Sequence, residues 1–208
     1  MALRTLELKP AQAGLSRTLV LLHGYGAVER DLLPIAHELD PRLRAVSLQG
    51  PLSLGGGARA WFNLTMGPRG LSFDAQEVRD GVSAAVEAVE AIAKESPRPI
   101  LLGFSQGAGM ALSVALRRPE LLSAVLSLSG VLRALEAADL APAAALRGFP
   151  VFAAHGTEDP VVPIALGRTI RDELLRHEMA LEWHEYPMGH MVLPEELDAA
   201  RTWLSLHL

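Results

Sequence analysis

Short apolar runs, each closed by turn residues, recur along this chain and alternate with longer amphipathic segments. The runs at 18–22, 99–104 and 124–128 are rich in leucine and valine and carry few polar residues. Strands of this kind are buried on both faces, as in parallel sheets that are covered by helices. The pattern predicts an α/β fold with a mostly parallel central sheet of about seven strands. The expected strands are 18–22, 43–48, 99–104, 124–128, 151–154 and 181–186, with 3–8 as a weaker candidate for an edge strand.

The amphipathic segments between the strands predict helices on both faces of the sheet. In residues 74–94, valine and isoleucine recur at three- and four-residue spacing, Asp74 can cap the start, and Pro97 follows the end. Segments 107–118, 164–178 and 195–206 have similar patterns. Because strands and helices alternate throughout, we expect one domain over residues 1–208 without a separate lid. In such sheets the chemistry lies at the carboxyl ends of the strands.

Residues 103–107 read G-F-S-Q-G and lie between an expected strand and an expected helix. This setting is typical of a nucleophile elbow, a sharp turn that lifts a serine hydroxyl above the sheet. The glycines allow neighbouring backbone to approach, and the helix that follows points its amino-terminal dipole at the site. The alternative is a glycine-rich turn with an incidental serine. The context favours Ser105 as a nucleophile.

A serine nucleophile needs a base, and the base needs an acid that orients it. In folds with a nucleophile elbow, the order along the chain is serine, acid, histidine, each after a strand. Asp159 follows the strand at 151–154, with the adjacent Glu158 as its rival and Asp139 as a weaker one. His190 follows the last expected strand and is our candidate for the base. Its rivals lie within a strand or on helices, namely His184, His177 and His207.

Acyl transfer also needs two backbone donors for the oxyanion. One is expected from the amide of Gln106, directly after the nucleophile, and the other from the loop after the strand at 18–22. That loop reads H-G-Y-G over residues 23–26, and the amide of Tyr25 is our candidate. We interpret His23 as a hydrogen-bonded histidine that holds the turn, rather than as a base or a metal ligand.

The segment 59–73 is expected to be long and irregular, and loops of this length are usually functional. Its apolar side chains either form the wall of a substrate pocket or only seal the edge of the sheet. The candidates for the wall are Trp61, Phe62, Met66 and Phe73, with Met188 and Met191 nearby.

Composition excludes several other classes of protein. The formal net charge of −5 gives no basic surface for nucleic acid or an anionic membrane. The chain has no cysteine, which excludes disulfides and thiolate chemistry. The first residues are interrupted by charges too early for a signal peptide, and no uninterrupted apolar stretch is long enough for a membrane span. We expect a cytoplasmic protein without a stable membrane anchor.

The motifs occur in the order of a known family. H-G-Y-G at 23–26, Q-G-P at 49–51, A-W-F at 60–62, G-F-S-Q-G at 103–107, H-G-T-E-D-P-V-V-P at 155–163 and G-H at 189–190 resemble the small carboxylesterase/phospholipase family, which includes acyl-protein thioesterases and bacterial carboxylesterases. The resemblance implies an α/β-hydrolase fold, no lid, hydrolysis of esters or thioesters, and no metal or organic cofactor. It is also compatible with a homodimer. Tyr25 departs from the leucine that members often carry, which affects the shape of the pocket, and the loop at 52–73 is glycine-rich and short. The acyl-length preference of the family therefore does not transfer.

We therefore expect a serine carboxylesterase that hydrolyses small-molecule esters with short to medium acyl chains through an acyl-enzyme, with Ser105, Asp159 and His190 as its triad. The alternative with the same machinery is a lysophospholipase or an acyl-protein thioesterase. The alternative from another class is a non-catalytic binding protein on this fold.

Overall fold

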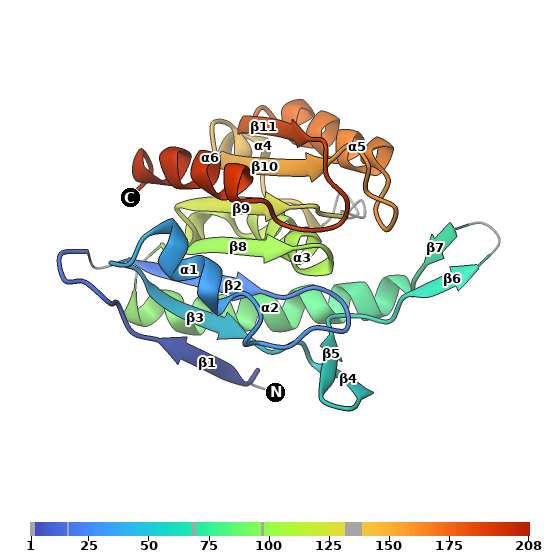
Figure 1. Ribbon diagram of the computed structural model, residues 1–208, viewed down its shortest axis with the longest axis horizontal. Helices are drawn as coiled ribbons and strands as arrows, with labels where there is room; N and C mark the ends of the chain where they lie inside the picture. Colours follow the sequence, from blue (N-terminus) through green and yellow to red (C-terminus); the bar gives the residue numbers. More distant parts are fainter. Residues whose placement is uncertain (1–2, 16, 68–69, 97, 132–138) are drawn as a thin grey trace.

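The computed structural model describes residues 3–15, 17–67, 70–96, 98–131 and 139–208, and its centre is a seven-stranded sheet (Figure 1). The strand order is β1-β3-β2-β8-β9-β10-β11. β1 pairs antiparallel with β3 at one edge, and every other pair in this sheet is parallel. The sequence-based prediction of a mostly parallel sheet with a weak edge strand is confirmed. The bounds are β1 (Thr5–Leu8), β2 (Thr18–Leu22), β3 (Arg44–Leu48), β8 (Ile100–Phe104), β9 (Ala124–Leu128), β10 (Pro150–Gly156) and β11 (Ala180–Tyr186).

Hydrophobic cores cover both faces of the sheet, because successive side chains of a strand point to opposite faces. In β2, Val20 and Leu22 belong to one core, whereas Leu19 and Leu21 belong to the other. The first core is completed by side chains of α2, α3 and α5, and the second by α1 and α6. Figure 1 shows α1 and α6 in front of the sheet, with α2 and α3 behind it. This double burial explains why the central strands are apolar at nearly every position.

The four long helices lie within about two residues of the predicted segments. Asp74 caps α2 as expected, since its carboxylate accepts hydrogen bonds from the amides of Gln76 and Glu77 at 2.8 and 3.0 Å. α1 was not predicted, because it has only seven residues and buries only two of them. The bounds are α1 (Leu33–Leu39), α2 (Ala75–Glu95), α3 (Gln106–Arg117), α4 (Ala143–Leu146), α5 (Ile164–Arg176) and α6 (Pro194–Ser205), with a 3₁₀ turn at Pro119–Leu121.

The expectation of an irregular segment at 59–73 was wrong. β4 (Leu52–Gly55) pairs with β5 (Ala58–Ala60), and β6 (Thr65–Gly67) pairs with β7 (Gly70–Ser72), both antiparallel. Strands of three or four residues with several glycines are too short to show a clear alternation in sequence. Both hairpins lie on the side toward which the parallel strands of the main sheet point (Figure 1).

Candidate active site

Ser105 occupies the sharp turn between β8 and α3 with a positive φ that non-glycine residues rarely adopt, φ 55° and ψ −118°. A non-glycine residue held in this region costs about 1–3 kcal/mol and marks a position that the surrounding structure enforces. The two flanking glycines are sterically required. A Cβ at Gly103 would lie 2.2 Å from the carbonyl oxygen of Gly107, and one at Gly107 would lie 1.9 Å from that of Leu22. The strand, turn and helix of a nucleophile elbow are therefore present.

A chain of hydrogen bonds joins three loops that follow three strands of the sheet. The Nε2 atom of His190 lies 2.8 Å from Ser105 Oγ, and its Nδ1 atom lies 2.6 Å from Asp159 Oδ2. Ser105 follows β8, Asp159 follows β10 and His190 follows β11. The tautomer with a proton on Nδ1 donates to the carboxylate and leaves Nε2 to accept the serine proton.

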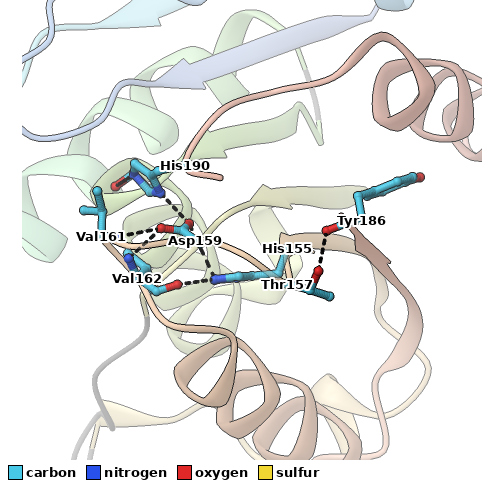
Figure 2. Close-up of polar contacts among 8 residues, drawn as sticks. His155, Thr157, Asp159, Val161, Val162, Tyr186 and His190 are labelled. Atoms are coloured by element: carbon cyan, nitrogen blue, oxygen red, sulfur yellow. Dashed lines mark hydrogen bonds and ion pairs between the residues drawn. The ribbon is translucent and has the colours of Figure 1, made fainter. Parts of the chain in front are cut away.

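The carboxylate of Asp159 is buried and receives three hydrogen bonds (Figure 2). Its Oδ1 atom accepts from the amides of Val161 and Val162, both at 2.8 Å, while Oδ2 faces His190. Backbone donors of this kind fix the plane of the carboxylate. The rival carboxylate, Glu158, belongs to an exposed residue, and its amide donates to the carbonyl of Met188.

The rival histidines make local hydrogen bonds in other parts of the fold. His184 pairs with Glu182 on β11, His177 contacts Glu173 on α5, and His207 contacts a backbone carbonyl of α6. None of these contacts involves Ser105. The geometry thus brings together the serine, aspartate and histidine that the sequence pattern selected.

His23 holds the loop after β2, as the sequence interpretation expected. Its Nδ1 atom donates to the carbonyl of Gly24 at 2.8 Å, and its Nε2 atom accepts from the amide of Gly50 at 2.9 Å. Burial lowers the pKa of His23, so the ring is neutral and can accept and donate at once. Further along the same loop, the amide of Gly26 donates to the carbonyl of Arg59, and the amide of Ala27 donates to the carbonyl of Gly24.

The side chain of Gln106 ties the elbow to the segment after β5, a link that sequence reasoning missed. Its Oε1 atom accepts from the amide of Trp61 at 2.9 Å, and its Nε2 atom donates to the carbonyl of Phe62 at 2.8 Å. The indole of Trp61 in turn donates to the carbonyl of His23 at 2.9 Å. The loop of Tyr25 and the start of α3 at Gln106, which carry the two candidate oxyanion donors, are therefore fixed relative to one another.

A sequence model described as phospholipase/carboxylesterase matches residues 7–208. The chain belongs to this family. It is similar to acyl-protein thioesterase 1 of Gibberella zeae, with 39% identity over 114 residues, which are 53% of this chain and 48% of that protein. In this match the chain thus spans about half the length of its relative.

Solved structures agree with the family assignment over the whole fold. The structure of esterase PE8 is 28% identical, has a TM-score of 0.86 and covers 100% of both chains. The carboxylesterase of Bacillus cereus is 25% identical with a TM-score of 0.84, and the match covers 99% of this chain and 95% of that one. In the described part of the present member of the family, no group of three or more His, Asp or Glu side chains is arranged to hold a metal ion.

The predicted pocket residues of this family member lie in different environments. Trp61 and Phe62 are 1% and 5% exposed and belong to a core, and Phe73 packs edge-to-face on Phe62. Met188 is also buried, whereas Met191 is 52% exposed. The side chain of Met66 lies outside the described residues. The buried aromatics offer little area to a ligand in this conformation, and their place in a substrate pocket stays a prediction.

Proposed function

We propose that this chain is a serine carboxylesterase that hydrolyses short- to medium-chain carboxylic esters through an acyl-enzyme. The observation that carries the proposal is the continuous hydrogen-bonded chain from Asp159 through His190 to Ser105, with distances of 2.6 and 2.8 Å. The family membership and the similarity to esterases support the same reaction class. Ser105, Asp159 and His190 form the proposed triad.

In the first half of the reaction, His190 Nε2 takes the proton of Ser105 Oγ as that oxygen attacks the ester carbonyl. The imidazolium that forms is stabilised by the carboxylate of Asp159, which stays ionised. The amides of Tyr25 and Gln106 donate to the oxyanion. The Gln106 amide suits this role because the first amides of a helix have no intrahelical acceptor. His190 then gives its proton to the leaving alcohol.

In the second half, His190 takes a proton from water, and the resulting hydroxide attacks the acyl-enzyme carbonyl. The tetrahedral intermediate collapses with return of the proton to Ser105 Oγ and release of the carboxylic acid. Each proton removed by His190 is thus returned within the cycle. The proposed cycle uses only this chain, water and the ester.

Exposed apolar side chains on the loops of the site argue for an apolar acyl or alcohol group in the substrate. Tyr25, Val161 and Met191 are 40%, 48% and 52% exposed, and each lies on a loop that carries a proposed catalytic group. The sequence-based candidates Trp61, Phe62, Phe73 and Met188 stay in the proposed pocket, and so does Met66, whose side chain lies outside the described residues. Each acyl methylene buried contributes about 0.8 kcal/mol, but only as far as the apolar surface extends.

A second candidate function uses the same groups on a longer acyl chain. The relative from Gibberella zeae is named an acyl-protein thioesterase, which favours protein-thioesterase activity, and the family description includes phospholipases, which favours lysophospholipase activity. The partner of the chain is then a lipid or an acylated protein rather than a small ester.

One domain over 1–208, a cytoplasmic location and a homodimer stay predictions. No described helix is long and apolar enough to cross a bilayer.

Fluorophosphonate labelling tests the activated serine directly. We expect the native protein to be labelled and to hydrolyse p-nitrophenyl esters, while Ser105→Ala abolishes labelling and His190→Ala lowers kcat about a thousandfold or more with folding intact. Circular dichroism melting of each variant controls for folding. A native protein that resists labelling and hydrolyses no ester would favour the non-catalytic binding protein.

The acyl preference separates the two candidate functions. For p-nitrophenyl esters from acetyl to palmitoyl, we expect kcat/KM to rise to a maximum near butyryl to octanoyl and then to fall. A steady rise through palmitoyl would instead support the lysophospholipase or thioesterase reading. Parallel assays with thioesters of the same acyl chains then distinguish the oxygen leaving group from the sulfur one.

A further inference from the structure

His155 lies near the end of β10, directly behind the loop that carries Asp159 (Figure 2). It is only 1% exposed, and its Nε2 atom lies 2.8 Å from the carbonyl oxygen of Val162. A carbonyl only accepts, so the ring carries its proton on Nε2 and donates it to that carbonyl. The proposed reaction makes no direct use of this buried imidazole.

The residue that His155 holds is the one that orients the acid. The amide of Val162 donates to Asp159 Oδ1 at 2.8 Å, while the carbonyl of the same residue accepts from His155. Both backbone groups of Val162 are therefore occupied, one by the proposed acid and one by the buried ring. A rotation of this backbone segment would lengthen both hydrogen bonds together, so the position of the ring limits how far the carboxylate can turn.

The ring of His155 is itself held from two sides. A Cβ placed on Gly167 of α5 would lie 2.6 Å from His155 Nδ1 and 2.8 Å from Cγ, so the backbone of α5 lies directly against the ring. On another side, the indole of Trp183 from β11 lies nearly parallel to it, with ring centroids 6.4 Å apart and an interplanar angle of 24°. The imidazole thus connects the acid loop to two elements of the rigid scaffold.

The ring of His155 also lies close to the acid itself. His155 Nε2 lies 3.8 Å from Asp159 Oδ2, which is too long for a hydrogen bond. The side chains of the two residues are 1% and 0% exposed, so water does not screen the pair. The ring is therefore a close, buried neighbour of the oxygen that faces His190.

On these contacts we propose that His155 is a positioning residue for the triad. It acts through the backbone of Val162 to hold the carboxylate of Asp159 in the plane that His190 requires, with Gly167 fixing the ring. The inference rests on the proposed function, because it assigns His155 to the support of that reaction. If His155 only filled space, its substitution would lower the stability of the protein without a specific change in the chemistry.

A pair of amide variants separates the two roles. In His155→Gln the side-chain amide reaches about as far as Nε2 and keeps a donor for Val162, whereas in His155→Asn the chain is one methylene shorter. We expect kcat of His155→Asn to fall about ten- to hundredfold with KM little changed, since misplacement of a catalytic group by about 1 Å has effects of this size. His155→Gln should recover most of the lost activity.

The pH profile of kcat/KM provides a readout that a space-filling role does not move. Its acid limb reports the base of the free enzyme, here His190. A carboxylate that is turned away stabilises the imidazolium less, so the acid limb of His155→Asn should shift to lower pH, while that of His155→Gln should stay near the wild-type position. Equal profiles and equal kcat for all three proteins would overturn the proposal.

A double-mutant cycle tests whether His155 acts through the acid. In an Asp159→Asn background, the further change His155→Asn should alter kcat by less than about twofold, because there is no carboxylate left to orient. An undiminished loss in that background would overturn the proposal. Where His155→Asn gives no cooperative melting transition, Gly167→Ala serves instead. It displaces the ring without removing any hydrogen-bonding group, and an unchanged kcat and acid limb would count against the proposal.

Failure of this inference is distinguishable from failure of the proposed function. If the native protein neither reacts with the fluorophosphonate nor hydrolyses esters, then the proposed function fails, and with it the role assigned to His155. If the native protein is labelled and active but the His155 variants match it in kcat and pH profile, then only the inference fails.

Discussion

Two buried carboxylic acids flank the His190 loop, and they differ in the number of hydrogen bonds that they accept. Asp159, in the loop after β10, is 6% exposed, and Glu196, in the first turn of α6, is fully buried at 0%. The carboxylate of Asp159 accepts three hydrogen bonds of 2.6 to 2.8 Å. Glu196 accepts one at 3.3 Å from the amide of Leu193, and its Oε1 atom has no partner within the described residues.

The comparison shows what burial does to a carboxyl that has few hydrogen-bond donors. Desolvation by burial raises the pKa of Glu196 to about 7, and the single bond from Leu193 offsets this only in part. Leucine at the position before the helix has no side-chain acceptor, so only one half of a capping box forms. Three donors thus surround the carboxylate of Asp159, whereas Glu196 has a single donor and a raised pKa.

We expect the largest loss of activity when the proposed acid is replaced, and little loss when the other buried acid is replaced. Asp159→Asn should lower kcat by about four orders of magnitude, because the amide favours the wrong tautomer of His190. Glu196→Gln should leave kcat within about twofold near neutral pH, since the protonated acid and the amide have similar shapes and both lack charge. Steady-state kinetics with a p-nitrophenyl ester measure both variants.

The matched control for this comparison is Glu158→Gln, which alters the exposed neighbour of the proposed acid and should retain near wild-type kcat. Activities in the reverse order, with Glu158→Gln impaired and Asp159→Asn active, would transfer the acid role to Glu158. A loss in Glu196→Gln as large as that in Asp159→Asn would show that both buried acids serve the chemistry.

The next effect is on stability. Since the pKa of Glu196 is raised from 4.5 to about 7 in the folded state, the folded protein binds this proton more tightly than the unfolded chain. This contribution to the free energy of unfolding is fully present below about pH 4.5 and is lost as pH rises through about 7. The total change is about 3 kcal/mol, from about 1.4 kcal/mol for each pKa unit.

Urea denaturation of wild type and Glu196→Gln at several pH values measures this term. The variant should be more stable than wild type at about pH 8.5, and the gap should close toward about pH 5. Wild-type controls at each pH account for the other titrating groups. A gap that is constant across this range would mean that Glu196 keeps an ordinary pKa and that its missing partner is supplied by water.

Local pattern predicted the fold and the candidate site to different depths. Ser105, Asp159 and His190 could be predicted from the sequence, because each follows a buried strand and the carboxyl ends of parallel strands meet at one edge of the sheet. The role of the Gln106 side chain could not be predicted, because its partner Trp61 lies 45 residues away in sequence and only folding brings the two together. His155 was read only as part of a family motif, since its ring meets Val162 across a turn.

The burial of Glu196 could have been read from the sequence. Glu196, Ala200 and Trp203 recur at the spacing of one helix face, and all are buried. A glutamate in the first turn of a helix is usually expected to face solvent, where its charge interacts favourably with the helix dipole. For this reason Glu196 was not predicted to lie on the apolar face. The short hairpins at 52–60 and 65–72 lacked any comparable periodic signal.

The smallest expected effect comes from a partly buried carboxylate, Glu185, whose pKa is shifted in the opposite direction from that of Glu196. Hydrogen bonds from Arg168, and then from Trp183, lower the pKa of Glu185 to about 2. A lowered pKa contributes stability above about pH 4.5, and that contribution is lost as pH falls through about 2. Because the side chains of Arg168 and Glu185 are 49% and 24% exposed, solvent screening limits the contribution to at most about 1 kcal/mol.

Glu185→Gln should therefore lower the free energy of unfolding slightly at neutral pH, by about 1 kcal/mol or less, and the loss should shrink further in high salt. Near pH 2 the two proteins should have equal stability, because the wild-type carboxyl is then being protonated. The same urea series used for Glu196→Gln measures this difference. A Glu185→Gln variant more stable than wild type at neutral pH would mean that the desolvation of Glu185 outweighs its hydrogen-bond donors.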